Sequence, residues 1–256
     1  MENQRVCTVG CNILTQLDSM CYANHCQVWY RLGRNHTDFN FFFNAPRRVS
    51  IDNMRNGTID HALKTGSEFV FFYDDDVLVP TDAFAKLLKV MDNDTDAAVV
   101  SGLTYIRKFP FDPMLFKSDE EMNLTGYKDF KEHVDENGLL EKDLGAVGFS
   151  CVLIRTSFLK DLKPPYCITG SQNTEDVYLC HRIRNHFPNA KILCDTTIDT
   201  SHLVERYFIN DEGRSLLLNY EKDINGAEVQ SDDRGIEYAE SIESRLREQP
   251  DEERVS

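Results

Sequence analysis

The stretch Phe69-Val70-Phe71-Phe72-Tyr73-Asp74-Asp75-Asp76-Val77-Leu78-Val79-Pro80 decides the fold that this sequence predicts. The apolar run 69–73 indicates a buried strand, and it leads directly into three consecutive aspartates. Adjacent carboxylates repel one another unless a cation or hydrogen-bond donors compensate their charge. Because ligands bind at the carboxyl ends of strands in open α/β sheets, this position favours a divalent-cation site over a solvated acidic loop.

Strand-like and helix-like segments alternate on both sides of this stretch. Strands are predicted at 6–14, 39–43, 68–73, 97–103, 144–154, 191–194 and 198–203, and helices at 18–32, 50–63, 80–91 and 174–187. Continuously apolar strands that alternate with helices predict an α/β fold, with a mostly parallel central sheet that helices cover on both faces. Residues 104–143 show no sustained period and predict a covering loop with a few short strands.

The composition argues against several classes of protein. The 256 residues include 28 Lys and Arg against 43 Asp and Glu, a formal net charge of −15, so general binding to nucleic acid is not expected. We find no apolar run near the roughly 20 residues of a membrane-spanning helix, and we expect no signal peptide. Eight widely spaced cysteines predict reduced, buried thiols. We therefore expect a cytoplasmic location, or the host cytoplasm if the source is a virus.

The aspartate triplet resembles the Asp-x-Asp region of GT-A glycosyltransferases, most closely the family 2-like group with its small, stand-alone bacterial, viral and phage members. Further segments resemble that group's elements in the same order. Arg55-Asn56 is similar to its Ala-Arg-Asn element, 144–155 to its Gly-rich strand, 173–180 to the Glu-Asp motif that opens a helix, and 199–203 to the late strand with a metal-binding His. The first strand departs from the pattern, because it lacks the family's Pro-Thr-like turn.

The resemblance implies a GT-A-like, Rossmann-type catalytic domain over 1–205, with a donor half at about 1–103 and an acceptor half at about 104–205. Residues 206–256 are expected to form an acidic extension that is partly helical and ends in disorder. The implied activity is hexosyltransferase-like. A sugar moves with inversion from a nucleotide diphosphate, UDP- or GDP-linked, to a hydroxyl of a glycan, lipid, protein or modified base, with Mn²⁺ or Mg²⁺ as cofactor.

The same motifs imply the site residues. Asp74, Asp76 and His202 would hold the metal ion. Asp176 would be the general base that accepts the proton of the acceptor hydroxyl, with Glu175 as a second catalytic residue or as an orienting or capping neighbour. Donor contacts are implied for Thr8, Asn44, Arg55, Asp74, Asp75 and Gly148. The donor base stays open, since the second strand ends at Asn44 where the family often has an acid.

The residues also leave other functions open. The Asp74–Asp76 cluster is compatible with a metal-dependent phosphoesterase or nuclease, and with a non-catalytic carbohydrate- or Ca²⁺-binding module. A zinc site at Cys21, His25 and Cys26 would need a second ligand pair at suitable spacing, which we do not find. A nucleotidyltransferase would need a Gly-rich phosphate loop with Arg and Lys after the first strand, and Val9-Gly10-Cys11-Asn12 does not provide one.

Overall fold

The fold is given by a computed structural model, which describes residues 4–12, 17–45, 49–119, 123–170, 174–204 and 207–211. These residues belong to one structural unit, residues 1–214. Most of the expected acidic extension, from residue 212 on, lies outside the described residues. In the described part of the chain, no helix is both long and apolar enough to span a membrane.

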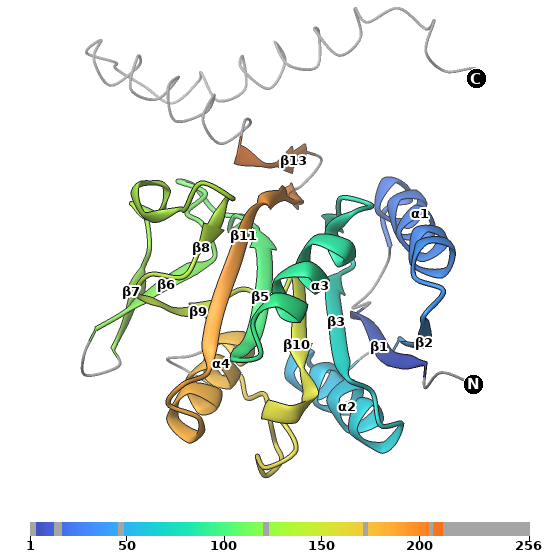
Figure 1. Ribbon diagram of the computed structural model, residues 1–256. Coiled ribbons are helices and arrows are strands. Elements are labelled where there is room, and N and C mark those ends of the chain that lie inside the picture. Colours follow the sequence, from blue (N-terminus) through green and yellow to red (C-terminus); the bar gives the residue numbers. More distant parts are fainter. Residues whose placement is uncertain are drawn as a thin grey trace, which may run out of the picture. The chain divides into compact units, whose positions relative to one another are not determined.

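A seven-stranded sheet forms the centre of the molecule, in the order β2-β1-β3-β10-β5-β11-β8 (Figure 1). Five strands point the same way: β1 (Arg5–Asn12), β2 (Phe39–Asn44), β3 (Phe69–Asp74), β5 (Ala97–Leu103) and β11 (Lys191–Asp199). The other two, β10 (Cys151–Arg155) and β8 (Leu139–Leu140), run antiparallel to their neighbours. Every residue of β5 is buried, as are the apolar residues of β3, which explains their uninterrupted apolar sequences. The predicted, mostly parallel α/β sheet is confirmed.

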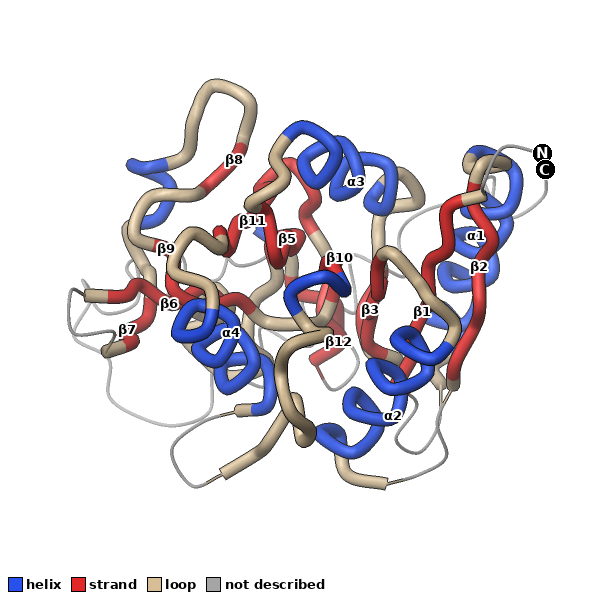
Figure 2. The backbone as a smooth tube through the Cα atoms, turned by 60° about the horizontal axis from the view of Figure 1, so that its bottom comes forward, coloured by secondary structure: helices blue, strands red, loops and turns tan. Residues whose placement is uncertain are grey.

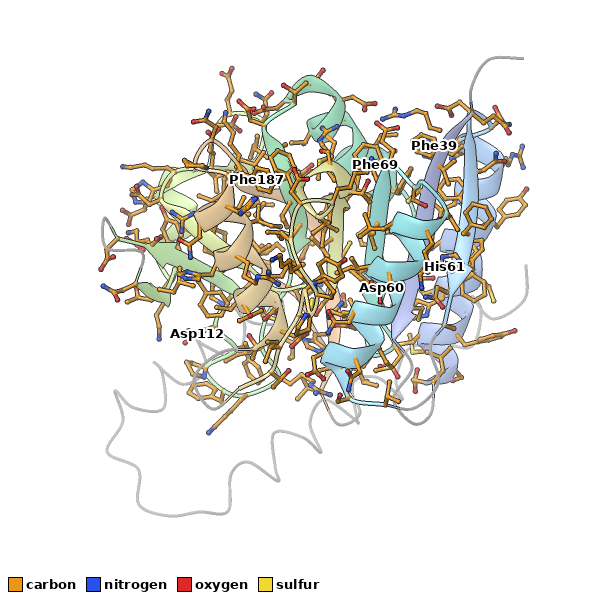
Figure 3. The ribbon with its side chains drawn as sticks, turned by 90° about the horizontal axis from the view of Figure 1, so that it is seen from below. Phe39, Asp60, His61, Phe69, Asp112 and Phe187 are labelled. Carbon is orange, nitrogen blue, oxygen red and sulfur yellow. The ribbon has the colours of Figure 1, made fainter. Side chains whose placement is uncertain are left out.

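Four helices cover the two faces of this sheet. On one face, α1 (Ser19–Asn35) and α3 (Ala83–Asn93) pack against a core that contains Phe71 and Tyr73. On the other lie α2 (Ile51–Lys64), which carries the labelled Asp60 and His61, and α4 (Glu175–His186), which Phe187 follows (Figures 2 and 3). The side chain of Asp18 caps α1 by accepting from the backbone N–H groups of residues 20 and 21. Helices on both faces were also predicted.

Over the described residues, two small sheets accompany the central one. One has the order β13-β12-β4, from β4 (Val77–Leu78), β12 (Ser201–Val204) and β13 (Tyr207–Ile209). The other has the order β7-β6-β9, from β6 (Leu115–Ser118), β7 (Leu124–Gly126) and β9 (Leu144–Val147). Two 3₁₀ turns, η1 (Phe130–His133) and η2 (Thr156–Phe158), lie outside them. The segment 104–143 therefore contains short strands, as expected, and β13 extends the pairing beyond residue 205.

Four predicted elements differ in the structure. The apolar segment 144–154 is two strands, because residues 148–150 interrupt it: β9 joins a small sheet, and β10 enters the central sheet between β3 and β5. The segments 191–194 and 198–203 are divided differently, since β11 continues through polar residues to Asp199; it pairs with β8 at residues 194 and 195 and with β5 as far as Asp199. Helix α3 begins at Ala83, after a turn that follows Pro80.

Candidate functional site

The aspartate triplet lies at the carboxyl end of β3, where the parallel strands end. Asp74 is the last residue of β3 and pairs in register with Asn12, the last residue of β1. The chain then turns into β4, which pairs antiparallel with β12 so that Val77 faces His202. The backbone N–H of Leu203 donates to the carbonyl oxygen of Asp76 at 2.8 Å. This pairing brings the late strand with its histidine beside the end of the triplet.

Asp76 and His202 form one half of the candidate site. The Nε2 atom of His202 lies 3.5 Å from Oδ1 of Asp76. Its Nδ1 atom is 2.7 Å from the carbonyl oxygen of Tyr105, which only accepts, so Nδ1 donates to that carbonyl and Nε2 is the ring nitrogen that faces Asp76. The other oxygen of Asp76 accepts from Nη1 of Arg107 at 2.8 Å. Burial by itself raises the pKa of Asp76, but the His202 and Arg107 contacts outweigh it and the pKa is lowered.

This half fits a divalent cation in its chemistry. A carboxylate oxygen and an imidazole nitrogen are ligands that Mn²⁺ accepts, and a ligating histidine usually donates its other N–H to a backbone carbonyl, as His202 does to Tyr105. Over the described ranges, no group of three or more His, Cys, Asp or Glu side chains is arranged to hold a metal ion. A cation held by Asp76 and His202 would therefore take its remaining ligands from water and substrate oxygens.

A buried arginine joins the other carboxylates of the site. Arg55 on α2 has a side chain only 2% exposed, and its Nη2 lies 3.0 Å from Oδ1 of Asp74. Its Nε donates to Oε1 of Glu175 at 3.0 Å. Burial acts to lower the pKa of Arg55, but the negative charges of Asp74 and Glu175 raise it, so the guanidinium stays charged. We call the contact Asp74–Arg55–Glu175 the Arg55 bridge; it connects β3, α2 and α4.

Asp176 follows in the first turn of α4 and is buried, with 4% of its surface exposed. Its Oδ1 accepts from the hydroxyl of Thr174 and from the backbone N–H of Val177. Burial raises the pKa of Asp176, and it raises the pKa of Glu175 as well. Burial thus favours uptake of a proton by both carboxyls, although Arg55 and the helix N-terminus act in the opposite direction and favour their charged forms.

Two residues that the sequence analysis did not assign belong to the Arg55 bridge. Ser150 donates its hydroxyl to Oδ2 of Asp74 at 2.9 Å, and the backbone carbonyl of Phe149 lies 3.4 Å from Nη1 of Arg55. The rings of Phe149 and Phe72 both pack against the guanidinium. Phe149 and Ser150 both lie in the Gly-rich segment 144–155, so the sequence offered a reason to consider them. Their contacts with Arg55 and Asp74, however, depend on the pairing of β10 with β3.

Several predicted donor residues lie elsewhere or are engaged by protein groups. Thr8 is completely buried in the middle of β1, and its hydroxyl bonds to that of Ser67, which precedes β3 and lies away from its acidic end. We therefore remove Thr8 from the site. Both carboxylate oxygens of Asp74 contact Arg55, and Arg55 itself is enclosed, so positioning suits these two better than direct contact with a ligand.

The remaining predicted residues lie near the carboxyl edge. Asn44 ends β2 and donates to the hydroxyl of Thr58 at 3.2 Å, and Asp75 is buried within the triplet. At Gly148, an added Cβ would come within 2.6 Å of the Met114 side chain, so the close approach that this glycine allows is to protein. These observations leave Asn44 and Asp75 as candidates for donor contacts.

The histidine and cysteines of α1 do not form the alternative zinc site. The Nε2 of His25 bonds to the carbonyl oxygen of Val77 at 3.1 Å, and its Nδ1 lies 3.8 Å from Sγ of Cys11. All eight cysteines are free and seven are buried. A cavity of about 440 Å³ is lined by residues of α3, of β11 and of the turn before β8, and contains none of the predicted site residues.

The sheet and its acidic strand end define a class of fold, the GT-A-like, Rossmann-type α/β sandwich that the sequence predicted. The crystal structure of A197 from STIV shares this fold with a TM-score of 0.51, at 16% identity over 78% of this chain and 86% of that one. CMP:2-keto-3-deoxy-manno-octonic acid synthetase complexed with CTP has a TM-score of 0.44 at 11% identity, over 89% of this chain and 100% of that one. S. aureus TarS 1–349 in complex with UDP-GlcNAc has a TM-score of 0.40 at 12% identity, over 80% of this chain and 57% of that one. No family model and no curated protein matches the sequence. At these identities, the similarity concerns the fold.

Proposed function

We propose that this protein is a nucleotide-sugar-dependent glycosyltransferase that inverts the anomeric centre, with Asp176 as its general base. One observation carries the proposal: the Arg55 bridge links the acidic end of β3 to the α4 N-terminus, which holds a buried carboxyl with a raised pKa. A site for a charged leaving group and a site for a base thereby adjoin, as displacement at a sugar carbon requires.

Asp76 and His202 would hold Mn²⁺ or Mg²⁺ in this proposal. A bound cation would supply positive charge to the diphosphate as it departs. Asp74, which was also expected to hold the ion, would instead fix the end of β3 in this proposal, because its oxygens already accept from Arg55 and Ser150. Asn44 and Asp75 remain the candidates for contacts to the base and ribose, because Asn44 ends β2 and Asp75 directly follows the end of β3.

Asp176 would take up the proton that the reaction releases. The acceptor hydroxyl oxygen forms a bond to the anomeric carbon from the side opposite the diphosphate, and its proton passes to the Asp176 carboxylate. The bond from the anomeric carbon to the diphosphate oxygen breaks, and its electron pair leaves with the nucleoside diphosphate. Burial suits Asp176 to this task because the raised pKa makes it a stronger base than an exposed aspartate.

Release of nucleoside diphosphate from a panel of UDP-, GDP-, CDP- and dTDP-sugars, with and without Mn²⁺ and an acceptor mixture, tests the proposal. We expect one donor to be consumed only with the cation, and transfer to exceed hydrolysis when an acceptor is present. Asp176→Asn should still bind the nucleotide but lose turnover by about 10²–10⁴-fold. A protein that hydrolyses donors or phosphate esters equally without acceptor would be a phosphoesterase, and one that binds sugar without turnover would be a binding module.

Asp195→Asn is the matched control. Asp195 is also a buried aspartate whose Oδ1 accepts from a threonine hydroxyl and a backbone N–H, both of Thr197. These hydrogen bonds stay within its own strand, β11, and Asp195 lines the cavity beside α3 rather than the acidic end of β3. Equal loss of turnover in the two variants would remove Asp176 from the role of base.

A further inference from the structure

The segment between β5 and β6 places the guanidinium of Arg107 beside Asp76, at the end of the triplet. This segment is closed on itself, because Tyr105 and Pro113 form a β-bridge and the N–H of Ile106 donates to the carbonyl of Asp112 at 2.9 Å. Within it, Arg107 reaches out and donates from Nη1 to Oδ2 of Asp76 at 2.8 Å. The same segment supplies the Tyr105 carbonyl that orients His202.

Arg107 and Arg55 both contact aspartates of the triplet but differ in accessibility. The Arg55 side chain is 2% exposed and bonded to Asp74, Glu175 and a backbone carbonyl, so it cannot reach a ligand without losing buried ion pairs. The Arg107 side chain is 59% exposed. An exposed ion pair of this kind is weak, so the guanidinium can leave Asp76 at small cost.

The position of Arg107 conflicts with a cation on the same carboxylate. Asp76 directs one oxygen toward Nε2 of His202 and the other toward Arg107. A divalent ion held by Asp76 and His202 would repel the guanidinium and withdraw negative charge from its partner. A diphosphate bound to that ion would at the same time place phosphate oxygens next to Arg107, and a guanidinium pairs with phosphate through two parallel hydrogen bonds.

We propose that Arg107 is a diphosphate-binding residue of this site: it neutralises Asp76 while the site is empty and transfers to the leaving diphosphate when cation and donor bind. The inference rests on the proposed function and adds a residue to it. Arg107 would stabilise the negative charge that develops on the diphosphate as its bond to the sugar breaks.

The exchange predicts two effects of opposite sign for Arg107→Ala. Without nucleotide, loss of the competing guanidinium should tighten Mn²⁺ binding by about two- to fivefold, as expected for an exposed ion pair. At saturating Mn²⁺, loss of a charged hydrogen-bond donor should weaken nucleoside diphosphate binding by about ten- to a hundredfold. A residue that only supports the local structure would weaken both.

Mn²⁺ affinity is measured by electron paramagnetic resonance with the metal alone, and UDP, GDP, CDP and dTDP affinities by calorimetry at saturating Mn²⁺, on the full chain. Lys128→Ala is the matched control, because Lys128 is a 65% exposed cation paired at 2.8 Å with an aspartate outside the triplet, Asp112. Arg107→Lys should restore part of the nucleotide affinity. Tighter Mn²⁺ and weaker nucleotide binding, seen in Arg107→Ala but not in Lys128→Ala, support the proposal.

Two results refute the proposal at different levels. If the wild-type chain binds Mn²⁺ and one nucleotide but Arg107→Ala behaves like Lys128→Ala, or weakens both ligands, the role of Arg107 is wrong and the proposed function stands. If the wild-type chain binds neither Mn²⁺ nor any of the four nucleotides, both the proposed function and the role of Arg107 are refuted.

Discussion

Replacing Arg55 by methionine tests whether the Arg55 bridge holds the site together. Methionine keeps much of the side-chain volume but removes the charge that faces Asp74 at 3.0 Å and Glu175 at 3.0 Å. Removing one partner of a buried ion pair costs about 3–5 kcal/mol, because the remaining charge is left buried and unpaired. With about 2–4 °C per kcal/mol for a domain of this size, the Tm should fall by about 6–20 °C.

Lys191→Ala is the control that shows how much of the effect on stability comes from the burial of the ion pair. Lys191 also contacts two carboxylates, those of Asp94 and Glu141, each at 3.0 Å, but its side chain is 36% exposed. Its removal should cost no more than about 1 kcal/mol, since exposed ion pairs contribute little. Urea unfolding, followed by circular dichroism and the fluorescence of Trp29, gives the free energy of unfolding for both variants.

The pH dependence provides a second readout. The pKa values of Glu175 and Asp176 are raised in the folded protein, so the folded state binds more protons than the unfolded state above the ordinary carboxyl pKa, and stability falls as pH rises through the raised values. Without Arg55, the charged forms of these carboxyls lose a stabilising positive charge, whereas their protonated forms do not need it. The difference in free energy of unfolding between the wild type and Arg55→Met should therefore become smaller toward acid pH. A deficit no larger than that of Lys191→Ala, or one independent of pH, would refute the reasoning.

Three further outcomes are expected. Because burial raises the pKa of Asp176, the acid limb of kcat/KM should lie above the ordinary aspartate value of about 3.9, and a pH profile that places the limb at that ordinary value would contradict the assignment of the base. Gly10→Ala would place a Cβ 2.8 Å from side-chain atoms of Phe72 and Thr58 and should lower the free energy of unfolding by about 1–3 kcal/mol in urea, whereas Gly57→Ala, with nothing within 4 Å, should not be destabilising. His202→Ala should weaken Mn²⁺ binding by at least about tenfold in a paramagnetic resonance titration, with His186→Ala as control; equal affinities would exclude His202 as a ligand.

The class of fold was predictable because its signals are local. Period and composition distinguish a buried strand such as 69–73 from an amphipathic helix such as 50–63, and the alternation of the two requires a mostly parallel sheet. That rule also places the ends of parallel strands at one edge, so the sequence alone was enough to identify the triplet as a candidate site. The end of α2 is also a local signal, because Gly66 follows the helix with a φ of +68°, which favours glycine.

The contacts of the site residues depended on distant partners. Arg55 and Glu175 are 120 residues apart, and nothing in either local pattern shows that one guanidinium bridges them to Asp74. The same is true of β10: an apolar run reads alike in either direction, so only the packing against β3 and β5 decides that it is antiparallel and brings Ser150 onto Asp74.

By itself, then, the sequence determined the α/β class, the acidic strand end and the order of the elements, because hydrophobic period and turn chemistry act over a few residues. Only the tertiary structure decided which carboxylates are paired and which can meet a ligand. In the structure, Thr8 is buried within the sheet and Arg55 is buried between carboxylates, whereas Asp76 lies beside His202 and Arg107. The physical reason is that charge pairing and burial are set by side chains from remote segments, whose meeting depends on strand register and helix packing.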